Sequence, residues 1–328
     1  MMNYLKLIRP INLIILALTM FLFRVCLASA SAYKLFSVYS ILSSSEFLLL
    51  VLASVFIAAG GYVINDIYDI EIDIINRPNK LIVGNSISED NAYNLYKLLC
   101  FLGILCTLLL AFLTKNYRLS TLPIVIMVVL NFYAHTFKRQ LIVGNFMIAL
   151  SASFAILLIA LFEIGDAGVE LSSNESYIKS GIVISGVVYA LFAFLTTFMR
   201  EIIKDIEDVN GDQQYGCSTI PIVFGIKVAK VVVVILGVLI LGLLISFVHF
   251  FYILQLMKTV YILGLALVFP LFVILLMVVL AKKMNWFSNI SRLLKLFICI
   301  GLASMLYFLD GSGPHIFVEY INYLKKLL

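Results

Sequence analysis

The strongest constraint on the fold is a series of long apolar runs that follow one another almost without interruption. A helix needs about 20 apolar residues to cross the hydrocarbon core of a bilayer, and each run is long enough for one crossing. Continuous runs indicate helices, because a closed barrel shows short alternating strands instead. We therefore expect an all-α fold, a polytopic membrane helical bundle of about nine transmembrane helices. The predicted spans lie near residues 11–32, 47–64, 93–113, 119–134, 144–164, 181–199, 229–252, 259–281 and 293–309.

The composition agrees with a lipid environment. Hydrophobic residues make up 63% of the 328 residues, charged residues only 12%, and the mean hydropathy is +1.11. A soluble domain carries roughly a quarter charged residues, so no sizeable soluble domain is expected. The net charge of +5 is typical of Lys and Arg in cytoplasmic loops rather than of a nucleic-acid surface. We expect membrane lipids and no nucleic acid as partners.

The N-terminal segment has two interpretations. Lys6 and Arg9 precede the apolar run 11–23, and Ala28-Ser29-Ala30 follow it, which is the order of a cleaved signal peptide. Arg24 interrupts that order before the small residues, so a retained first span is favoured. An arginine inside a span marks a functional site or snorkels to the interface, and both readings of Arg24 stay open.

The orientation follows from counting Lys and Arg in alternating loops. With a cytoplasmic N-terminus, the inside segments hold 14 of these residues and the outside segments hold 7. This bias predicts a multi-pass protein with its N-terminus in the cytoplasm and its C-terminus outside.

Acidic residues are distributed even less evenly. Nine of the 18 Asp and Glu lie in two short stretches, 66–73 and 201–212, and both are predicted in loops on the cytoplasmic face. The remaining acids include Glu163, Asp166, Glu170 and Glu175, which fit an ordinary external loop. Because acids contribute little to topology, the two clusters need another explanation.

Both acidic stretches contain the pattern D-x2-D-x3-D. The two copies begin 139 residues apart and indicate an internal repeat of a helix-loop unit. At positions i, i+3 and i+7, three carboxylates share one face of a helix. The residues of the two triads are Asp66, Asp69 and Asp73, and Asp205, Asp208 and Asp212.

Three like charges on one face repel one another unless a cation lies among them. Oxygen ligands without nearby His or Cys favour Mg²⁺ or Ca²⁺, and Mg²⁺ commonly combines one or two carboxylates with phosphate oxygens. Two facing triads therefore predict two ions bridged by a diphosphate. Nearby bases would complete the anion clamp: Arg77, Lys80, Lys138, Arg139, Arg200 and Lys204. The alternative is a solvated acidic face, which two copies with one spacing on one membrane face argue against.

At this point the residues resemble a known family. The motif from Asn65 to Asp73 with Asn76-Arg77-Pro78, together with the second triad, looks like the UbiA prenyltransferase superfamily, and the resemblance covers nearly the whole chain. Arg9-Pro10-x-Asn12 is similar to the family's start, which also favours a retained first span. The resemblance implies a single transmembrane prenyltransferase domain over 1–328, with pseudo-repeat halves of about 1–143 and 144–328.

The resemblance also implies a reaction. Mg²⁺ on both catalytic triads binds a prenyl diphosphate, whose ionisation gives an allylic cation that a lipid or aromatic acceptor captures. Asn12, Asn65, Tyr133 and Lys138 match family positions that bind substrate. The family often continues N-R-P-x-R-P, whereas this chain has Lys80-Leu81, and lysine lacks the bidentate fork of arginine.

The acceptor is less constrained. The regions Tyr133 to Asn145 and Arg200 to Asp205 resemble the branch that makes archaeal-type ether lipids, in which geranylgeranylglyceryl phosphate accepts a geranylgeranyl group. Lys138, Arg139, Arg200 and Lys204 offer cations for an acceptor phosphate. The stretch from Asp208 to Thr219 is also similar to quinone and tocopherol prenyltransferases, so an aromatic acceptor is the alternative. A cation transporter is less favoured, because mid-span charge is nearly absent.

Overall fold

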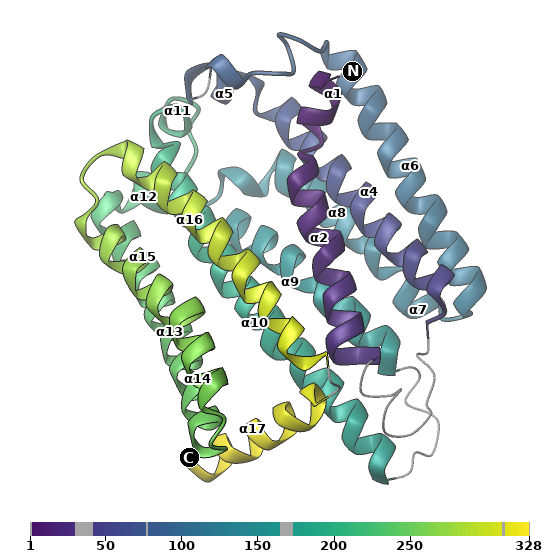
Figure 1. Ribbon diagram of the computed structural model, residues 1–328. Helices are drawn as coiled ribbons and strands as arrows, with labels where there is room; N and C mark the ends of the chain where they lie inside the picture. The colour runs from purple at the N-terminus through teal and green to yellow at the C-terminus, as the bar shows by residue number, and fades with distance from the viewer. Residues whose placement is uncertain (1, 30–41, 77, 165–172, 310–311, 328) are drawn as a thin grey trace. The chain divides into compact units, whose positions relative to one another are not determined.

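The computed structural model describes residues 2–29, 42–76, 78–164, 173–309 and 312–327 (Figure 1). The chain divides into two compact units, and each combines segments distant in the sequence. Unit 1 consists of Met1–Met20, Leu42–Ser151 and Asp208–Val223, and unit 2 of Phe21–Ile41, Ala152–Glu207 and Phe224–Leu328. The described residues are almost entirely helical, with one isolated bridge between Val83 and Ile87.

The predicted membrane spans are confirmed within these described ranges. Nine helices there are long and apolar enough to cross a bilayer. Many of their large apolar side chains face outward, including Phe112 at 74% exposure and Leu265 at 70%. So many exposed apolar side chains suit a surface bathed in lipid rather than water. The chain is therefore an all-α integral membrane protein.

Unit 1 is built around the helices that follow the first span. Its helices are α1 (Met2–Leu7), the first part of α2 (Pro10–Phe23), α4 (Ser44–Tyr68), α5 (Ile70–Asn76), η2 (Pro78–Lys80), α6 (Glu89–Thr114), α7 (Tyr117–Ser120), α8 (Leu122–His135), η3 (Phe137–Arg139), the start of α9 (Val143–Ile164), α11 (Val209–Gln214) and α12 (Ile220–Val223).

Helices α4 and α6 run side by side because small residues lie where they cross (Figure 1). A Cβ added to Gly103 would lie 2.8 Å from the Ile57 side chain, so this crossing admits only glycine without movement. At the start of α4, Ser43 and Glu46 form a capping box, with Ser43 N–H donating to the Glu46 carboxylate at 2.7 Å. Helix α4 is thus held against α6, and the C-terminal end of α4 carries the start of the first aspartate motif.

Unit 2 holds the remaining long helices. Its helices are the end of α2, the π-helix η1 (Arg24–Ser29), most of α9, α10 (Ser173–Glu207), α13 (Gly225–Ile253), α14 (Met257–Leu263), the π-helix η4 (Gly264–Val268), α15 (Phe269–Leu280), α16 (Met284–Ala303), η5 (Ser304–Phe308) and α17 (Gly313–Leu327). Helix α17 was missing from the sequence-based prediction. It packs on α10 and α13, and its Tyr320 hydroxyl lies 2.5 Å from that of Ser246.

One sequence-based expectation in unit 2 is wrong. Glu163 was assigned to an external loop, but it lies in α9, is 6% exposed, and its Oε1 is 3.2 Å from Nε of Arg24. The error arose because an isolated acid at a span end looks like a loop residue. Asp166 and Glu170 lie outside the described residues, and the Glu175 side chain is likewise not described. Arg24 is thus an ion-pair partner inside unit 2.

Candidate active site

The two aspartate motifs share one backbone design. In each, a long helix ends just before the middle aspartate and a short helix begins after it: α4 gives way to α5 at Asp69, and α10 to α11 at Asp208. The two middle residues have matching dihedrals, φ −96° and ψ 0° at Asp69, φ −96° and ψ 4° at Asp208. The two motifs were predicted to lie in loops. In the structure they are helical instead, and each triad spans the junction of two helices at its middle aspartate.

Asn76 joins the two motifs within unit 1. Its Nδ2 donates to the backbone carbonyl of Asp208 at 2.9 Å, and its Oδ1 accepts from the backbone N–H of Gly211 at 2.8 Å. A Cβ at Gly211 would lie 2.6 Å from the Asn76 side chain, so the approach requires glycine. Figure 1 shows α5 and α11 next to each other as a result.

The first aspartate of the first motif is paired with an arginine. Nη2 of Arg9 lies 2.5 Å from Oδ1 of Asp66, and the guanidinium carbon lies 5.1 Å from the centre of the Tyr62 ring. Burial alone would lower the pKa of Arg9, but the Asp66 carboxylate raises it above its ordinary value. Arg9 has φ 53°, a conformation that is uncommon outside glycine, at the turn between α1 and α2.

The middle aspartate of the first motif is buried and forms an ion pair with a lysine. Asp69 is 5% exposed, its Oδ2 forms an ion pair with Lys138, and it accepts a hydrogen bond from Asn65 Nδ2 at 2.6 Å. Burial would lower the pKa of Lys138, but Asp69, with smaller contributions from Tyr133 and Asp212, raises it. Lys138 therefore lies within electrostatic reach of both motifs.

The second motif is also buried at its far end. Asp212 is 7% exposed, and the neighbouring Cys217 thiol has its pKa raised to about 11, by burial first and by Asp212 second. The Ser218 N–H donates to the Arg139 carbonyl at 2.8 Å, which ties the segment after the motif to η3. A Cβ at Gly144 would lie 2.8 Å from the Phe137 carbonyl oxygen, so η3 packs tightly on the start of α9.

Three predicted residues lie in unit 2, near the end of α10. Arg200 Nη1 and Lys204 Nζ both bind Glu201, at 3.1 Å and 2.7 Å, and Glu201 is 8% exposed. The Nε of Arg200 is buried and has no hydrogen-bond partner among the described residues. Such an unsatisfied buried donor calls for an explanation. Asp205 follows one turn after Glu201 on the same helix.

For several of the other predicted residues, the structure gives the position in the chain's helices and the exposure of the side chain. Asn12 lies in the first turn of α2 and Asp73 in α5, both partly exposed, and Arg139 is exposed. Arg77 lies outside the described residues, and so does the Lys80 side chain. Across the described ranges, no three His, Cys, Asp or Glu side chains are close enough together to hold a metal ion by themselves.

Sequence reasoning missed three contributors to this arrangement. Arg9 was noted only as part of a family-like start, Asn76 only as part of a motif, and Glu201 only as one acid in a cluster. Arg9 and Asn76 act on partners 57 and 132 or more residues away. The usable signals were the rarity of charge before the first span and an asparagine next to a carboxylate triad.

Comparison with known proteins agrees with the geometry. The profile described as the UbiA prenyltransferase family matches residues 25–299. A digeranylgeranylglyceryl phosphate synthase of Sulfurisphaera tokodaii is 28% identical over 315 residues, covering 95% of this chain and 98% of the relative. The synthase of the same name from Saccharolobus solfataricus is 31% identical, covering 79% of this chain and 82% of the relative.

Solved structures share the fold. A structure from work on digeranylgeranylglyceryl phosphate synthase in membranes has a TM-score of 0.60 and 23% identity, covering 94% of this chain and 98% of that one. A UbiA homolog from Archaeoglobus fulgidus bound to GPP and Mg²⁺ has a TM-score of 0.53 and 16% identity, covering 92% and 99%. The protein described by this sequence is an integral membrane prenyltransferase and belongs to the UbiA prenyltransferase family.

Proposed function

We propose that this prenyltransferase moves a geranylgeranyl group from its diphosphate to the hydroxyl of geranylgeranylglyceryl phosphate, with two Mg²⁺ ions at the aspartate motifs. The observation that carries the proposal is the Asn76 contact, which holds Asp208 and Gly211 of the second motif against the end of the first. With Arg9 and Lys138 paired to the first motif, unit 1 combines carboxylates and cations as a metal-bound diphosphate requires.

The donor set suits Mg²⁺ in two respects. All six motif ligands are carboxylates, and two of the most buried carboxylate positions, Asp69 and Asp212, lie in unit 1. Asp66 and Asp69 already carry a cationic side chain each, so positive charge is stabilised where an ion would bind. Among the described residues, no three acidic side chains lie close enough together to hold a metal ion by themselves. Phosphate oxygens would therefore supply the remaining ligands, as is common for Mg²⁺.

The chemistry has one bond breaking and one forming. The C1–O bond of the donor breaks, pyrophosphate leaves with the electron pair, and the acceptor oxygen forms an ether bond to C1 while its proton is released. Bound Mg²⁺ would supply charge neutralisation of the leaving pyrophosphate. Arg9 and Lys138 add positive charge beside it, a fixed arrangement that costs no reorganisation during the step. Tyr62, held under the Arg9 guanidinium, offers a π-face near the same place.

The acceptor assignment rests on the relatives and on four cationic side chains near the two motifs. The relatives named above are synthases of digeranylgeranylglyceryl phosphate, and one is matched along 98% of its length. A phosphate-bearing acceptor needs cationic contacts, for which we propose Arg139, Arg200 and Lys204, together with Lys138, which would be shared with the donor diphosphate. The unsatisfied Nε of Arg200 supports this role. Asn12, Asn65, Arg77, Lys80 and Tyr133 stay proposed contacts of the donor diphosphate.

The test is product analysis with purified protein in lipid nanodiscs. Radiolabelled geranylgeranyl diphosphate and Mg²⁺ are offered with geranylgeranylglyceryl phosphate in one arm and an aromatic quinone precursor in the other. We expect the diether phosphate to form only in the first arm. We also expect that it no longer forms when EDTA is added or when the Asp69→Asn variant is used. A product only in the aromatic arm would contradict the acceptor, and undiminished transfer by Asp69→Asn would contradict the site.

We further propose that the N-terminus and both motifs face the cytoplasm and that the C-terminus lies outside. The support is the two-to-one excess of Lys and Arg in the segments that this orientation places inside.

A further inference from the structure

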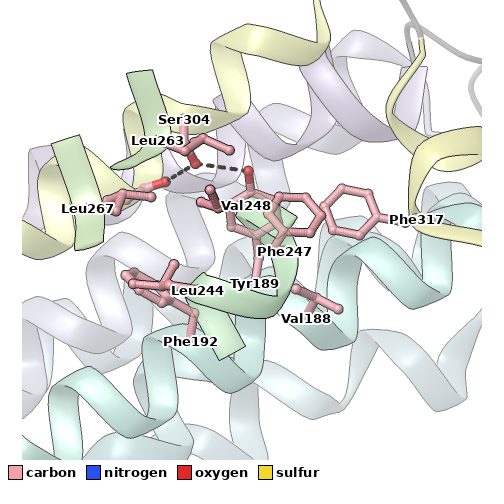
Figure 2. A pocket seen from close by; sticks show the side chains of 11 residues that line it. Val188, Tyr189, Phe192, Leu244, Phe247, Val248, Leu263, Leu267, Ser304 and Phe317 are labelled. Atoms are coloured by element: carbon pink, nitrogen blue, oxygen red, sulfur yellow. Dashed lines mark hydrogen bonds between the residues drawn. The ribbon is translucent and has the colours of Figure 1, made fainter. Parts of the chain in front are cut away.

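Unit 2 contains an apolar cavity that the proposed chemistry does not use. It measures about 60 Å³ and lies between α10, α13, α16 and α17, with η4 on one side (Figure 2). Val188, Phe192 and Phe317 are among its lining side chains. Its polar groups satisfy one another: the Tyr189 hydroxyl lies 3.0 Å from Ser304 Oγ, which donates to the Gly301 carbonyl at 2.6 Å. A water inside would find few partners, so the cavity suits an apolar occupant.

The walls of the cavity are fixed by close packing. A Cβ at Gly301 would lie 2.4 Å from the Phe192 ring. Helix α16 therefore packs so closely on α10 at this point that only glycine fits without movement. On the opposite side, the Phe317 ring of α17 stacks on Phe247 of α13, with centroids 5.5 Å apart and planes at 18°. Leu267 comes from a π-helix, an irregularity that is frequent at functional sites. The residues around the cavity are therefore closely packed against one another.

The position of the cavity along α10 is informative. Val188 and Phe192 precede Asp205 by 17 and 13 residues on one continuous helix. At 1.5 Å per residue, the cavity lies roughly 20 to 25 Å from the aspartate. An extended chain of four isoprene units is of that order of length. Along α10, a chain whose phosphate end lies at Asp205 would have its last units at the level of Val188 and Phe192.

We propose that this cavity binds the terminal isoprene unit of a geranylgeranyl chain and so sets the chain length that the enzyme accepts. The inference rests on the proposed function, because it takes the phosphate end to lie at Asp205 of the second motif. Donor and acceptor both carry such a chain, and the shared ligand is its far end. Val188 and Leu267 are then specificity-determining residues, since the side chains of both line the cavity.

The experiment fills the cavity and measures binding as a function of chain length. Val188→Phe adds volume inside it, whereas Val187→Phe makes the same change on the neighbouring residue, which is 51% exposed on the outside. Leu267→Phe and Leu265→Phe form a second matched pair on η4, with Leu265 70% exposed. The second pair keeps the test decisive if Val188→Phe does not fold.

Two ligand series are titrated by thermal stabilisation of the full-length protein. One is prenyl thiodiphosphates with one to four isoprene units, which do not ionise readily, and the other is prenylglyceryl phosphates of the same lengths. We expect the inward variants to weaken binding of the four-unit ligand at least tenfold and to leave the two-unit ligand unchanged, with both outward variants like wild type. The series that shows the loss identifies the chain that occupies the cavity.

An unchanged length profile in both inward variants would overturn the inference and leave the cavity a packing void. Failure of the proposed function looks different. Wild-type protein that binds no prenyl thiodiphosphate contradicts both proposals, whereas wild type that shows the length profile but makes no diether phosphate contradicts the acceptor alone.

Discussion

At the residue scale, two cationic side chains are already paired with carboxylates that we propose as metal ligands. Arg9 is bound to Asp66 and Lys138 to Asp69, so a Mg²⁺ ion at the proposed site would displace or share these partners. A diphosphate changes the balance, because the displaced cations then have phosphate oxygens to bind. We infer that metal and diphosphate bind together more tightly than either alone.

Arg9→Gln tests this exchange. Without the guanidinium, Asp66 loses its ion-pair partner, so affinity for Mg²⁺ alone should rise, while affinity for a non-reactive prenyl diphosphate analogue with Mg²⁺ should fall. One charge-assisted hydrogen bond corresponds to roughly a tenfold change in each. Isothermal titration checks both, and Lys6→Gln, an exposed charge in α1, serves as control. Changes of the same sign in both titrations would count against the exchange.

Asn76 and Gly211 provide the second prediction at this scale. Asn76→Ala removes both hydrogen bonds between the motifs, and at about 1 kcal/mol each the free energy of unfolding should fall by about 2 kcal/mol. We expect transfer activity to fall much further, because the motif geometry is lost. Gly211→Ala should act alike through its clash. Activity and thermal midpoints are compared with Asn85→Ala, an exposed asparagine with one long 3.5 Å contact. Full activity in Asn76→Ala would exclude the joining role.

The sequence revealed the carboxylates of the site but few of their partners. The D-x2-D-x3-D spacing is local, so both triads could be predicted from it. The ion pair of Arg9 with Asp66 joins residues 57 positions apart and depends on how α1 packs on α4. No local pattern encodes that packing. The same limit applies to Asn76, whose role follows from the approach of α11.

At the element scale, the predicted helices and the observed ones differ mainly at their ends. Apolar runs located the spans well, since each crossing must satisfy its own backbone. The apolar runs predicted that two of these spans end at residues 64 and 199, whereas α4 ends at Tyr68 and α10 at Glu207. The last turns of both helices contain polar residues, which an apolar run does not include. Helix α17 was missed for the same reason, being amphipathic and mixed in composition. The ends are where the motifs lie, so the functional geometry was the least predictable part.

The Arg24 and Glu163 pair makes a prediction about how elements are held together in unit 2. It joins η1 to α9, and the two side chains are 11% and 3% exposed. Arg24→Met alone removes a cation from a buried carboxylate, which should lower the free energy of unfolding by about 3–5 kcal/mol, whereas the Arg24→Met, Glu163→Met double variant should recover most of that loss. Thermal unfolding in detergent compares the single, the reciprocal single and the double variant. Additive losses would show that the pair does not act as a unit.

At the scale of the whole molecule, composition and family agree on a membrane enzyme, while the division into units was not predictable from sequence. Unit 1 takes residues 208–223, which include Asp208 and Asp212 of the second motif, from far along the chain. The repeat of the triads indicated two related halves near 1–143 and 144–328, which stay a prediction. A repeated sequence motif indicates which segments have a common origin, whereas a compact unit is defined by which residues contact one another. The boundaries of the two need not coincide.

The proposed orientation gives the last prediction. Lys326 near the end of α17 and Asn85 between α5 and α6 are both exposed. In a variant whose five cysteines are replaced by Ala, Lys326→Cys should react with a membrane-impermeant maleimide in intact cells, and Asn85→Cys only after permeabilisation. The physical reason is the excess of Lys and Arg that holds the Asn85 side in the cytoplasm. Activity of each variant shows that the fold is intact. Labelling of Asn85→Cys in intact cells, with Lys326→Cys protected, would reverse the orientation and place the aspartate motifs outside.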